Sequence, residues 1–223
     1  MLVDAIRRSE WIWAIFIFIS GPLTAVLYFF MVYRATALPS QGFELPGAAR
    51  RDRIKELETL IHDLDKPHHY LELGDIYFQK GNFAKAEENY RASLQRDPQD
   101  IDARAHLGQC LLRLKRAGEA LPILQQVCAE NPKHDYGYSL MAYAEALTAQ
   151  GETDTAIAVW KQVLQDHGYA RARVQLGELY LATKQPDLAA AQFREAISDD
   201  RHAPSYQRKR DRVWIRRGKR LLP

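Results

Sequence analysis

The sequence predicts an all-α protein: a single N-terminal transmembrane helix, then an α-solenoid of about four helix hairpins, then a C-terminal capping helix. Three observations predict it: an uncharged run over residues 11–33, a pattern that recurs about every 34 residues between 67 and 200, and a basic end with helical spacing of apolar residues. The 223 residues are 47% hydrophobic, with only 12 Gly and 10 Pro. This composition excludes a mainly disordered chain.

The predicted membrane helix follows a short N-terminal segment, residues 1–10, and reads WIWAIFIFISGPLTAVLYFFMVY. At about 1.5 Å per residue, this helix is long enough to cross a hydrocarbon core of about 30 Å. Trp11 and Trp13 stand at one end and Tyr28 and Tyr33 at the other, where amphipathic rings favour the two interfaces. The segment resembles the tryptophan-rich membrane stretch of cardiolipin synthases. Because the HxKxxxxD signature of those enzymes is absent, the resemblance implies no lipid chemistry.

Cleavage and orientation of this segment stay open. A signal peptidase could use the small residues 35–37, but the apolar run exceeds the roughly 7–15 residues of a signal peptide, which favours an uncleaved single-pass anchor. Arginines flank both sides, at Arg7 and Arg8 before the run and at Arg34 after it. Counting the later arginines and the basic end, we expect a bacterial inner-membrane protein with a cytoplasmic soluble part. The alternative is a periplasmic accessory to envelope assembly.

Residues 34–66 are expected to form a linker and then an amphipathic helix, because Ile54, Leu57, Ile61 and Leu64 fall at helical spacing. Four repeat units follow, at 67–100, 101–134, 137–169 and 170–200. The first helix of each unit carries a small residue where it should cross the second, at Gly74, Gly108, Ala144 and Gly177. The second helix carries alanine at the matching offsets, Ala86, Ala120, Ala156 and Ala189. A single hairpin cannot bury its apolar face, so the units must stack.

The turns and ends of these units have their own signals. Gly81 and Gly151 suit the turn between the paired helices, whereas Lys184 and Gln185 stand where the last unit should have glycine. The four units resemble tetratricopeptide repeats (TPR), which implies a right-handed solenoid that binds proteins or peptides in its concave groove. The resemblance places the following residues in that groove: Leu71, Asp75, Phe78, Asp102, Gln109, Leu112, Met141, Glu145, Val174, Glu178 and Leu181.

The groove positions predict a partner preference. Asp75, Glu145 and Glu178 would form an acidic row beside apolar residues, which suits a basic or amphipathic peptide; the alternative is a merely solvated helix face. Family members that hold acidic chaperone tails use Lys and Asn at the positions of Leu71 and Asp75. That activity is therefore not implied for this chain.

The sequence lacks the motifs that are typical of catalytic and metal-binding sites. The sequence has no phosphate loop, nucleophile elbow, CxxC or HExxH motif, so we expect neither an enzyme nor a cofactor. Cys110 and Cys128 lack metal-ligand spacing and are expected to be small buried apolar side chains. One dense group of possible metal ligands is interrupted by Pro67 and by a helix start: His62, Asp63, Asp65, His68 and His69. We expect Asp63 or Asp65 to satisfy free backbone groups at a helix end instead.

The C-terminal segment, residues 201–223, has nine Lys or Arg and one Asp, although the whole chain carries only +3. Asp199, Asp200 and Pro204 predict the start of its helix. An apolar stripe predicts that this helix caps the array: Ala203, Tyr206, Val213, Trp214 and Leu221. The exposed cations are then available to an acidic surface: Arg208, Lys209, Arg210, Arg212, Arg216, Arg217, Lys219 and Arg220.

These features together favour a membrane-anchored scaffold or adaptor that binds protein or peptide partners. A nucleic-acid or ribosome tether acting through the basic end is the alternative of a different class. It is less favoured because the repeats are acidic and the expected anchor brings lipid headgroups within reach first. The partner's identity and the oligomeric state do not follow from the sequence.

Overall fold

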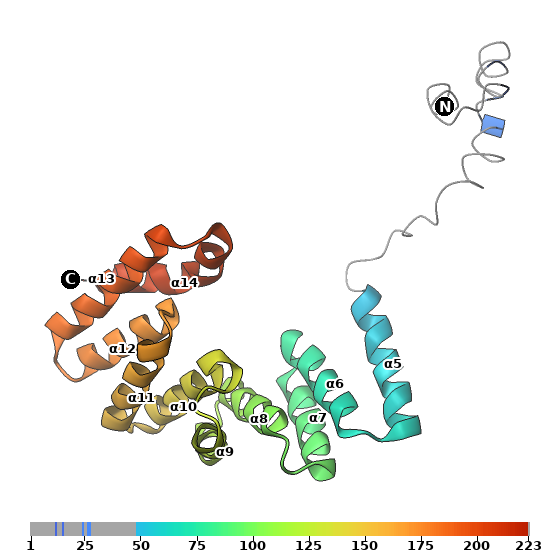
Figure 1. Cartoon of the computed structure of the whole chain (residues 1–223), viewed down its shortest axis with the longest axis horizontal. Coiled ribbons are helices and arrows are strands. Elements are labelled where there is room, and N and C mark those ends of the chain that lie inside the picture. The colour runs from blue at the N-terminus through green and yellow to red at the C-terminus, as the bar shows by residue number, and fades with distance from the viewer. Residues whose placement is uncertain (1–11, 13–14, 16–23, 25, 28–47, 223) are drawn as a thin grey trace. The chain divides into compact units, whose positions relative to one another are not determined.

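The computed structural model describes residues 12, 15, 24, 26, 27 and 48–222 (Figure 1). Every regular element from residue 48 onwards is helical, which confirms the all-α prediction for the described part of the chain. Most of the predicted transmembrane run, 11–33, lies outside the described residues, and no helix among those that are described is both long and apolar enough to span a membrane. Residues 53–223 cluster as one unit, and that unit is described by itself below.

Eight helices form four consecutive antiparallel pairs. They are α6 (Pro67–Gln79) with α7 (Phe83–Arg96), α8 (Ile101–Arg113) with α9 (Ala117–Glu130), α10 (Tyr138–Gln150) with α11 (Thr153–Asp166), and α12 (Ala170–Ala182) with α13 (Pro186–His202). Each helix packs against its partner, and the second helix of each pair packs against the first of the next (Figure 1). The hairpins therefore stack in chain order, as a solenoid requires.

Helix α5 (Ala48–Leu64) precedes the first pair. Its Leu57 is fully buried in the same core cluster as Leu73 and Tyr77, whereas Leu64, which the helical spacing placed on the inner stripe, is 53% exposed. The Arg53 side chain extends toward α6 and donates two hydrogen bonds of 2.6 Å to the Glu72 carboxylate. The contact of α5 with the first hairpin thus combines one buried leucine with an ion pair.

Small residues sit at the crossing points of the hairpins, as predicted. A Cβ atom added to Gly74 would lie 2.6 Å from the Tyr90 ring, and one added to Gly108 would lie 2.6 Å from Cγ of Leu124. Carbon atoms in ordinary contact are about 3.5–4.0 Å apart. Glycine is therefore required for the two helices to approach this closely.

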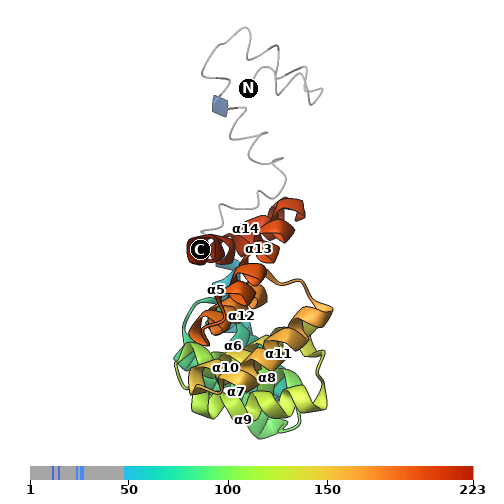
Figure 2. The ribbon, with the colours of Figure 1, turned by 90° about the vertical axis from the view of Figure 1, so that its left-hand side faces the viewer.

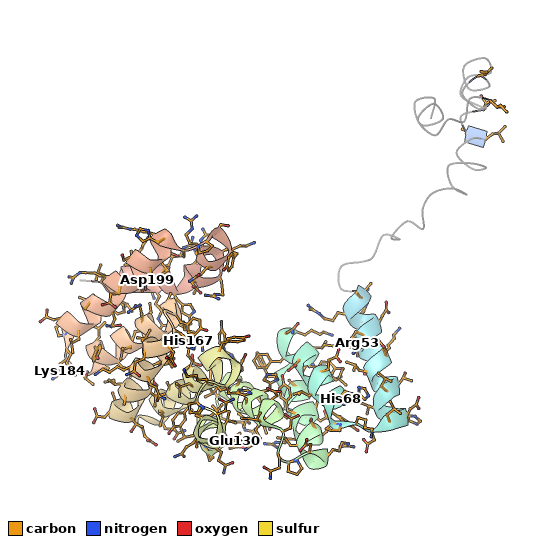
Figure 3. The ribbon with its side chains drawn as sticks, viewed as in Figure 1. Arg53, His68, Glu130, His167, Lys184 and Asp199 are labelled. Carbon is orange, nitrogen blue, oxygen red and sulfur yellow. The ribbon has the colours of Figure 1, made fainter. Side chains whose placement is uncertain are left out.

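The turn inside every hairpin contains one residue in the left-handed region. These residues are Gly81 (φ 74°), Lys115 (φ 64°), Gly151 (φ 81°) and Lys184 (φ 60°); Lys184 lies at the turn between α12 and α13 (Figure 3). Two of the four turns thus use lysine, one of them at Lys184, where glycine was expected, and the left-handed backbone conformation is the same. A residue with a Cβ atom adopts this conformation at a cost of about 1–2 kcal/mol.

A short 3-10 turn, η2 (His134–Gly137), is inserted between α9 and α10. Asp135 (φ 49°), Tyr136 (φ 51°) and Gly137 (φ 83°) are successive left-handed residues. The Tyr169 hydroxyl donates a hydrogen bond of 2.9 Å to the Tyr136 carbonyl, which ties the insertion to the start of α12. The insertion accounts for the two-residue slip in the repeat.

Helix α14 (Ser205–Leu221) packs against α12 and α13 at the end of the array (Figure 2). The predicted stripe is partly wrong: Trp214 packs against the core, but Tyr206 is 72% and Val213 69% exposed, and the buried face contains Ile215 and Gly218 instead. The helix is thus rotated about its own axis relative to the predicted orientation. This rotation brings Gly218 against the preceding repeat, where an added Cβ would lie 3.3 Å from Val174 Cγ2.

The predicted start of the last helix is also displaced. Asp199 and Asp200 belong to α13, which continues to His202, and Ala203 and Pro204 separate it from α14. Proline lacks a backbone N–H and disfavours a helical conformation in the residue before it. Ala203 accordingly has extended backbone (φ −73°, ψ 147°).

Candidate functional site

A large cavity, of about 650 Å³, is lined by α8, α10, α12 and α14, together with the turn that follows α8 and the start of α9. A neighbouring cavity of about 430 Å³ shares Glu145, Ala149, Gln175 and Arg217 with it. The two hollows are therefore continuous along the first helices of successive hairpins. We call this surface the groove.

The carboxylates predicted to form a free acidic row are occupied by other groups of the chain. Glu145 is bonded to the Arg171 guanidinium and accepts a hydrogen bond of 3.0 Å from the Gln175 amide. Glu178 is bonded to Arg217 of α14 through two guanidinium nitrogens. The acidic row is thus not open at these two positions, because Arg171 of α12 pairs with Glu145 of α10 and Arg217 of α14 pairs with Glu178 of α12.

The aspartate of the row, Asp75, is also occupied. The Asp75 carboxylate accepts a hydrogen bond of 2.9 Å from the Tyr90 hydroxyl and lies 2.8 Å from Nδ1 of His106. Burial alone would lower the pKa of His106, but the hydrogen bond and charge of Asp75 outweigh it, and the pKa lies above the ordinary 6.5. Asp75, Tyr90 and His106 line a cavity of about 70 Å³ together with Gln109, whose amide nitrogen is buried without a hydrogen-bond partner among the described residues.

Asp102 belongs to a partly buried chain of hydrogen bonds that resembles a catalytic triad in its distances. His134 Nε2 lies 2.9 Å from Asp102, and His134 Nδ1 lies 2.7 Å from the Ser139 hydroxyl. A nucleophile must reach its substrate, yet Ser139 is 1% exposed while Asp102 is the solvent-facing member. This chain of hydrogen bonds instead joins the start of α8, the inserted turn and the start of α10.

The apolar residues predicted for the groove separate into two groups. Met141 and Val174 are 1% and 0% exposed and belong to the core, and neither lines the two cavities of the groove. Leu71, Phe78, Leu112 and Leu181 are half-buried and pack against the core from its edge. Sequence spacing placed these six apolar residues on the same face of their helices. Whether each one is buried depends on how the neighbouring helix packs over that face.

The charge left open in the groove is positive. Arg113 and Lys115 line the large cavity, are exposed, and form no ion pair with any described residue. The Trp214 ring of α14 is close to two guanidinium groups, with Arg171 at 5.5 Å and Arg217 at 5.8 Å from the ring centroid. Sequence reasoning missed Arg113, Lys115 and Arg171. Their only signal was a positive charge near the C-terminal end of α8 and the N-terminal end of α12.

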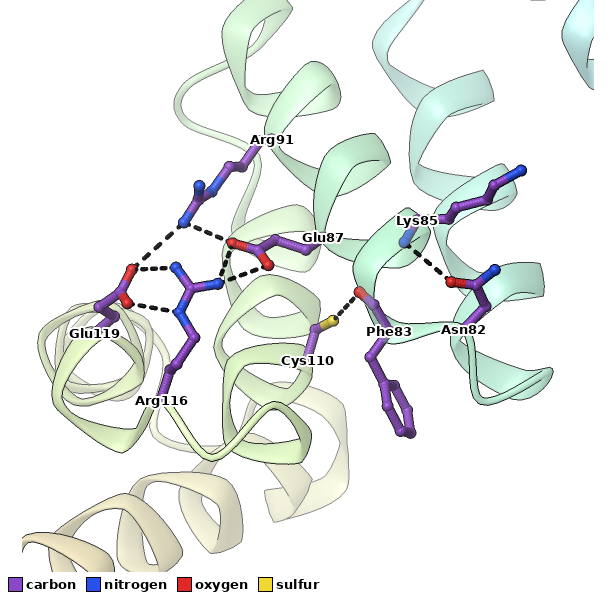
Figure 4. Close-up of polar contacts among 8 residues, drawn as sticks. All are labelled: Asn82, Phe83, Lys85, Glu87, Arg91, Cys110, Arg116 and Glu119. Atoms are coloured by element: carbon purple, nitrogen blue, oxygen red, sulfur yellow. Dashed lines mark hydrogen bonds and ion pairs between the residues drawn. The ribbon is translucent and has the colours of Figure 1, made fainter.

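The rim of the large cavity is held by a second set of ion pairs (Figure 4). Arg116 donates two hydrogen bonds of 2.8 Å to Glu87 and two of 2.6 Å to Glu119, and Arg91 joins both carboxylates. Behind them the Cys110 thiol donates to the Phe83 carbonyl at 3.2 Å. These contacts connect the first hairpin to the second and fix the position of the turn that carries Lys115.

The two thiols are buried, and Asp65 of the histidine-rich segment is bonded to neighbouring side chains. Burial raises the pKa of Cys110 to about 11 and that of Cys128 to about 12, so both remain protonated near neutral pH. Asp65, between the predicted clusters, accepts hydrogen bonds from Tyr70 and Arg96 instead of facing His68 or His69. Within the described ranges, no three potential ligands converge on one point.

Comparisons with known proteins agree with the repeat architecture. The family model described as tetratricopeptide repeat matches residues 70–144 and 147–212. A search of curated proteins finds no match. MamA of Desulfovibrio magneticus RS-1 is similar in structure, with 18% identity and a TM-score of 0.65 over 72% of this chain and 90% of that one.

Two further solved structures have the same arrangement. YrrB, described as a TPR protein with an unusual peptide-binding site, has 21% identity and a TM-score of 0.59 over 68% of this chain and 80% of its own. A thermophilic TPR protein of Thermus thermophilus, TTC0263, has 23% identity and a TM-score of 0.58 over 76% of this chain and 88% of its own. At such identities the likeness shows the fold alone.

Proposed function

Since the chain belongs to the tetratricopeptide repeat family, we propose that it is a protein-interaction scaffold that holds a peptide segment of a partner in the groove along α8, α10, α12 and α14. Repeats of this kind bind peptides or proteins on the surface formed by their first helices. The observation that carries the proposal is the pair of continuous cavities on that surface, of about 650 and 430 Å³. Hollows of this size accommodate several side chains of an extended peptide.

The charges of the groove favour a partner segment that contains acidic residues. Arg113 and Lys115 are exposed and available for ion pairing, whereas Glu145 and Glu178 already hold Arg171 and Arg217. A basic peptide, which the sequence alone favoured, would have to displace these intramolecular guanidinium groups before it could use the carboxylates. An acidic segment meets open cations, and charge-assisted bonds to arginine are about twice as strong as neutral ones.

A binding titration tests this preference. The full-length chain in detergent micelles is titrated with fluorescent peptides that differ only in having Asp and Glu or Lys and Arg at the charged positions. We expect the acidic peptide to bind more tightly, and the double variant Arg113→Gln/Lys115→Gln to lose about tenfold in affinity. The control variant Lys161→Gln/Arg194→Gln removes the same two charge types from α11 and α13, which do not line the groove.

We also propose that the scaffold is anchored in a bacterial inner membrane with its repeats in the cytoplasm. The support is the uncharged run at residues 11–33, with aromatic residues at both ends. Extraction of native membranes with alkaline carbonate should leave the chain in the membrane fraction. Reporter fusions after residue 222 then decide between the cytoplasmic placement and the periplasmic alternative.

The tether to nucleic acid remains the second candidate because of one observation on α14. Six cations are exposed and form no ion pair with the described residues: Arg208, Lys209, Arg212, Arg216, Lys219 and Arg220. Such binding would be steeply salt-dependent. Gel-shift titrations with RNA and duplex DNA, with and without Arg212→Gln/Arg216→Gln, separate this candidate from the scaffold.

A further inference from the structure

A further cavity of about 130 Å³, which we call the small cavity, lies between α10, α12 and α14, beside the groove. It shares Arg171 and Trp214 with the large cavity, so the two hollows are separated only by these side chains. Its volume is roughly four times the share of one water molecule and well below the 300–1,000 Å³ of a small-molecule site. The cavity therefore fits one large side chain of a bound peptide.

The lining of this cavity favours an aromatic or large aliphatic side chain. The Tyr138 and Tyr169 rings lie 5.4 Å apart between centroids, within the range of favourable aromatic contacts, and the Trp214 ring contributes a third wall. Met141 also contributes to the lining, and its unbranched thioether adapts to the shape of an inserted group. An apolar or aromatic group thus finds contact partners on several sides.

A cationic side chain is not favoured there, although the cavity contains a carboxylate. Asp211 is 8% exposed and accepts two hydrogen bonds from Arg210, at 2.8 and 3.0 Å. Its charge is therefore already compensated. An inserted lysine or arginine would instead meet the guanidinium groups of Arg210 and Arg171 at close range.

Arg171 connects the small cavity to the charge preference of the groove. It lines both hollows, contacts the Trp214 ring, and has a buried Nε–H without a hydrogen-bond partner among the described residues. An unsatisfied buried donor is costly, and a ligand carboxylate or carbonyl would satisfy it. A peptide carboxylate could do so while the adjacent side chain enters the small cavity.

We infer that helix α14 is a wall of the peptide site as well as the end of the array: with α10 and α12 it forms an anchor pocket for an aromatic or large aliphatic residue that lies next to an acidic residue of the partner. This inference rests on the proposed function and specifies its ligand. It also assigns the apolar face of the basic C-terminal segment a role in recognition, through Trp214.

Selection of peptides tests the inference. A phage-displayed library of random peptides is selected on the full-length chain in detergent micelles, and the best binder is synthesised. We expect the enriched sequences to contain an acidic residue beside Phe, Tyr, Trp, Leu, Ile or Met. Replacing that apolar residue by Ser should weaken binding to the wild type about tenfold, and much less to Trp214→Ala. Tyr206→Ala, on the exposed face of the same helix, should leave affinity within about twofold.

A crosslinking measurement covers the case in which Trp214→Ala fails to fold. A photo-leucine placed at the apolar position of the peptide should label residues that line the small cavity, identified by mass spectrometry on the wild-type chain. Acidic binders without an apolar anchor, or labelling elsewhere, would overturn the anchor pocket and leave the proposed function standing. Basic binders, or no binder at all, would overturn the acidic-peptide function and the pocket with it.

Discussion

Substitution of Gly108 by alanine tests the packing of the hairpins at a single atom. The added Cβ would lie 2.6 Å from Cγ and 2.7 Å from Cδ2 of Leu124, which is fully buried. Ordinary carbon contacts are about 3.5–4.0 Å, so α8 and α9 would have to separate by about 1 Å or Leu124 would have to leave its rotamer. The surrounding core leaves Leu124 no exposed volume into which to move.

The expected magnitude is a difference between two opposing terms. Overpacking a core by one methyl group costs about 1–3 kcal/mol, and replacing a helical glycine by alanine returns up to about 1 kcal/mol. Because two contacts of the added Cβ fall below 3.0 Å, the upper half of the overpacking range, about 2–3 kcal/mol, applies. The net loss is then about 1–2 kcal/mol, which corresponds to a fall of about 2–8 °C in Tm for a domain of this size. Gly118→Ala is the matched control, because that glycine is exposed and its nearest neighbour is the flexible Gln150 amide at 3.4 Å.

Thermal unfolding followed by circular dichroism at the helix band measures the change. Leu124→Ala in the Gly108→Ala background should cost less than in the wild type, with a coupling above about 0.5 kcal/mol, because the two atoms compete for one space. A Gly108→Ala variant at least as stable as the wild type, or strict additivity with Leu124→Ala, would refute the close crossing of the two helices.

The remaining predictions concern the turns, one histidine and the thiols. Lys184→Gly should raise the stability by about 0.5–1 kcal/mol, measured as Tm, because glycine adopts the left-handed turn without a Cβ penalty; no gain would show that the lysine is not strained there. The pKa of His106 is raised in the folded state, so protonation of this imidazole stabilises the fold. The contribution is complete below the ordinary pKa of 6.5 and is lost as the pH rises through the higher pKa of the folded state. The wild type should therefore exceed His106→Gln in Tm by more at about pH 5.5 than at about pH 8.5, and an unchanged or reversed difference would contradict the Asp75 contact. Cys110 and Cys128 should react with Ellman's reagent only after unfolding, because both are buried and protonated; fast labelling of the native chain would disprove their burial.

The repeat architecture could be predicted because its requirements are local. Two adjacent helices can cross closely only at a small residue, such as Gly74 and Gly108, and the turn at Gly81 requires a left-handed backbone. Each requirement therefore places a recognisable residue type at a fixed offset in the repeat. The turn at Lys184 shows that the backbone conformation persists without its preferred residue. The hairpin order follows from these residue types alone.

The charge of the groove could not be predicted from the same pattern. Glu178 is 39 residues from its partner Arg217, and Glu145 is 26 from Arg171. Which cation meets which carboxylate depends on the rotation of each helix about its own axis. That rotation is set by close contacts such as that of Gly218, which a helical stripe read from apolar spacing does not reveal.

The central claim is that the groove presents open cations to an acidic segment, and a titration at two salt concentrations tests it most directly. Binding of matched acidic and basic peptides to the full-length chain is measured by fluorescence anisotropy in the wild type and in Arg113→Gln/Lys115→Gln. We predict tighter binding of the acidic peptide, weakened by salt and reduced about tenfold in the double variant. Tighter binding of the basic peptide, or equal affinity in the double variant, would contradict the account.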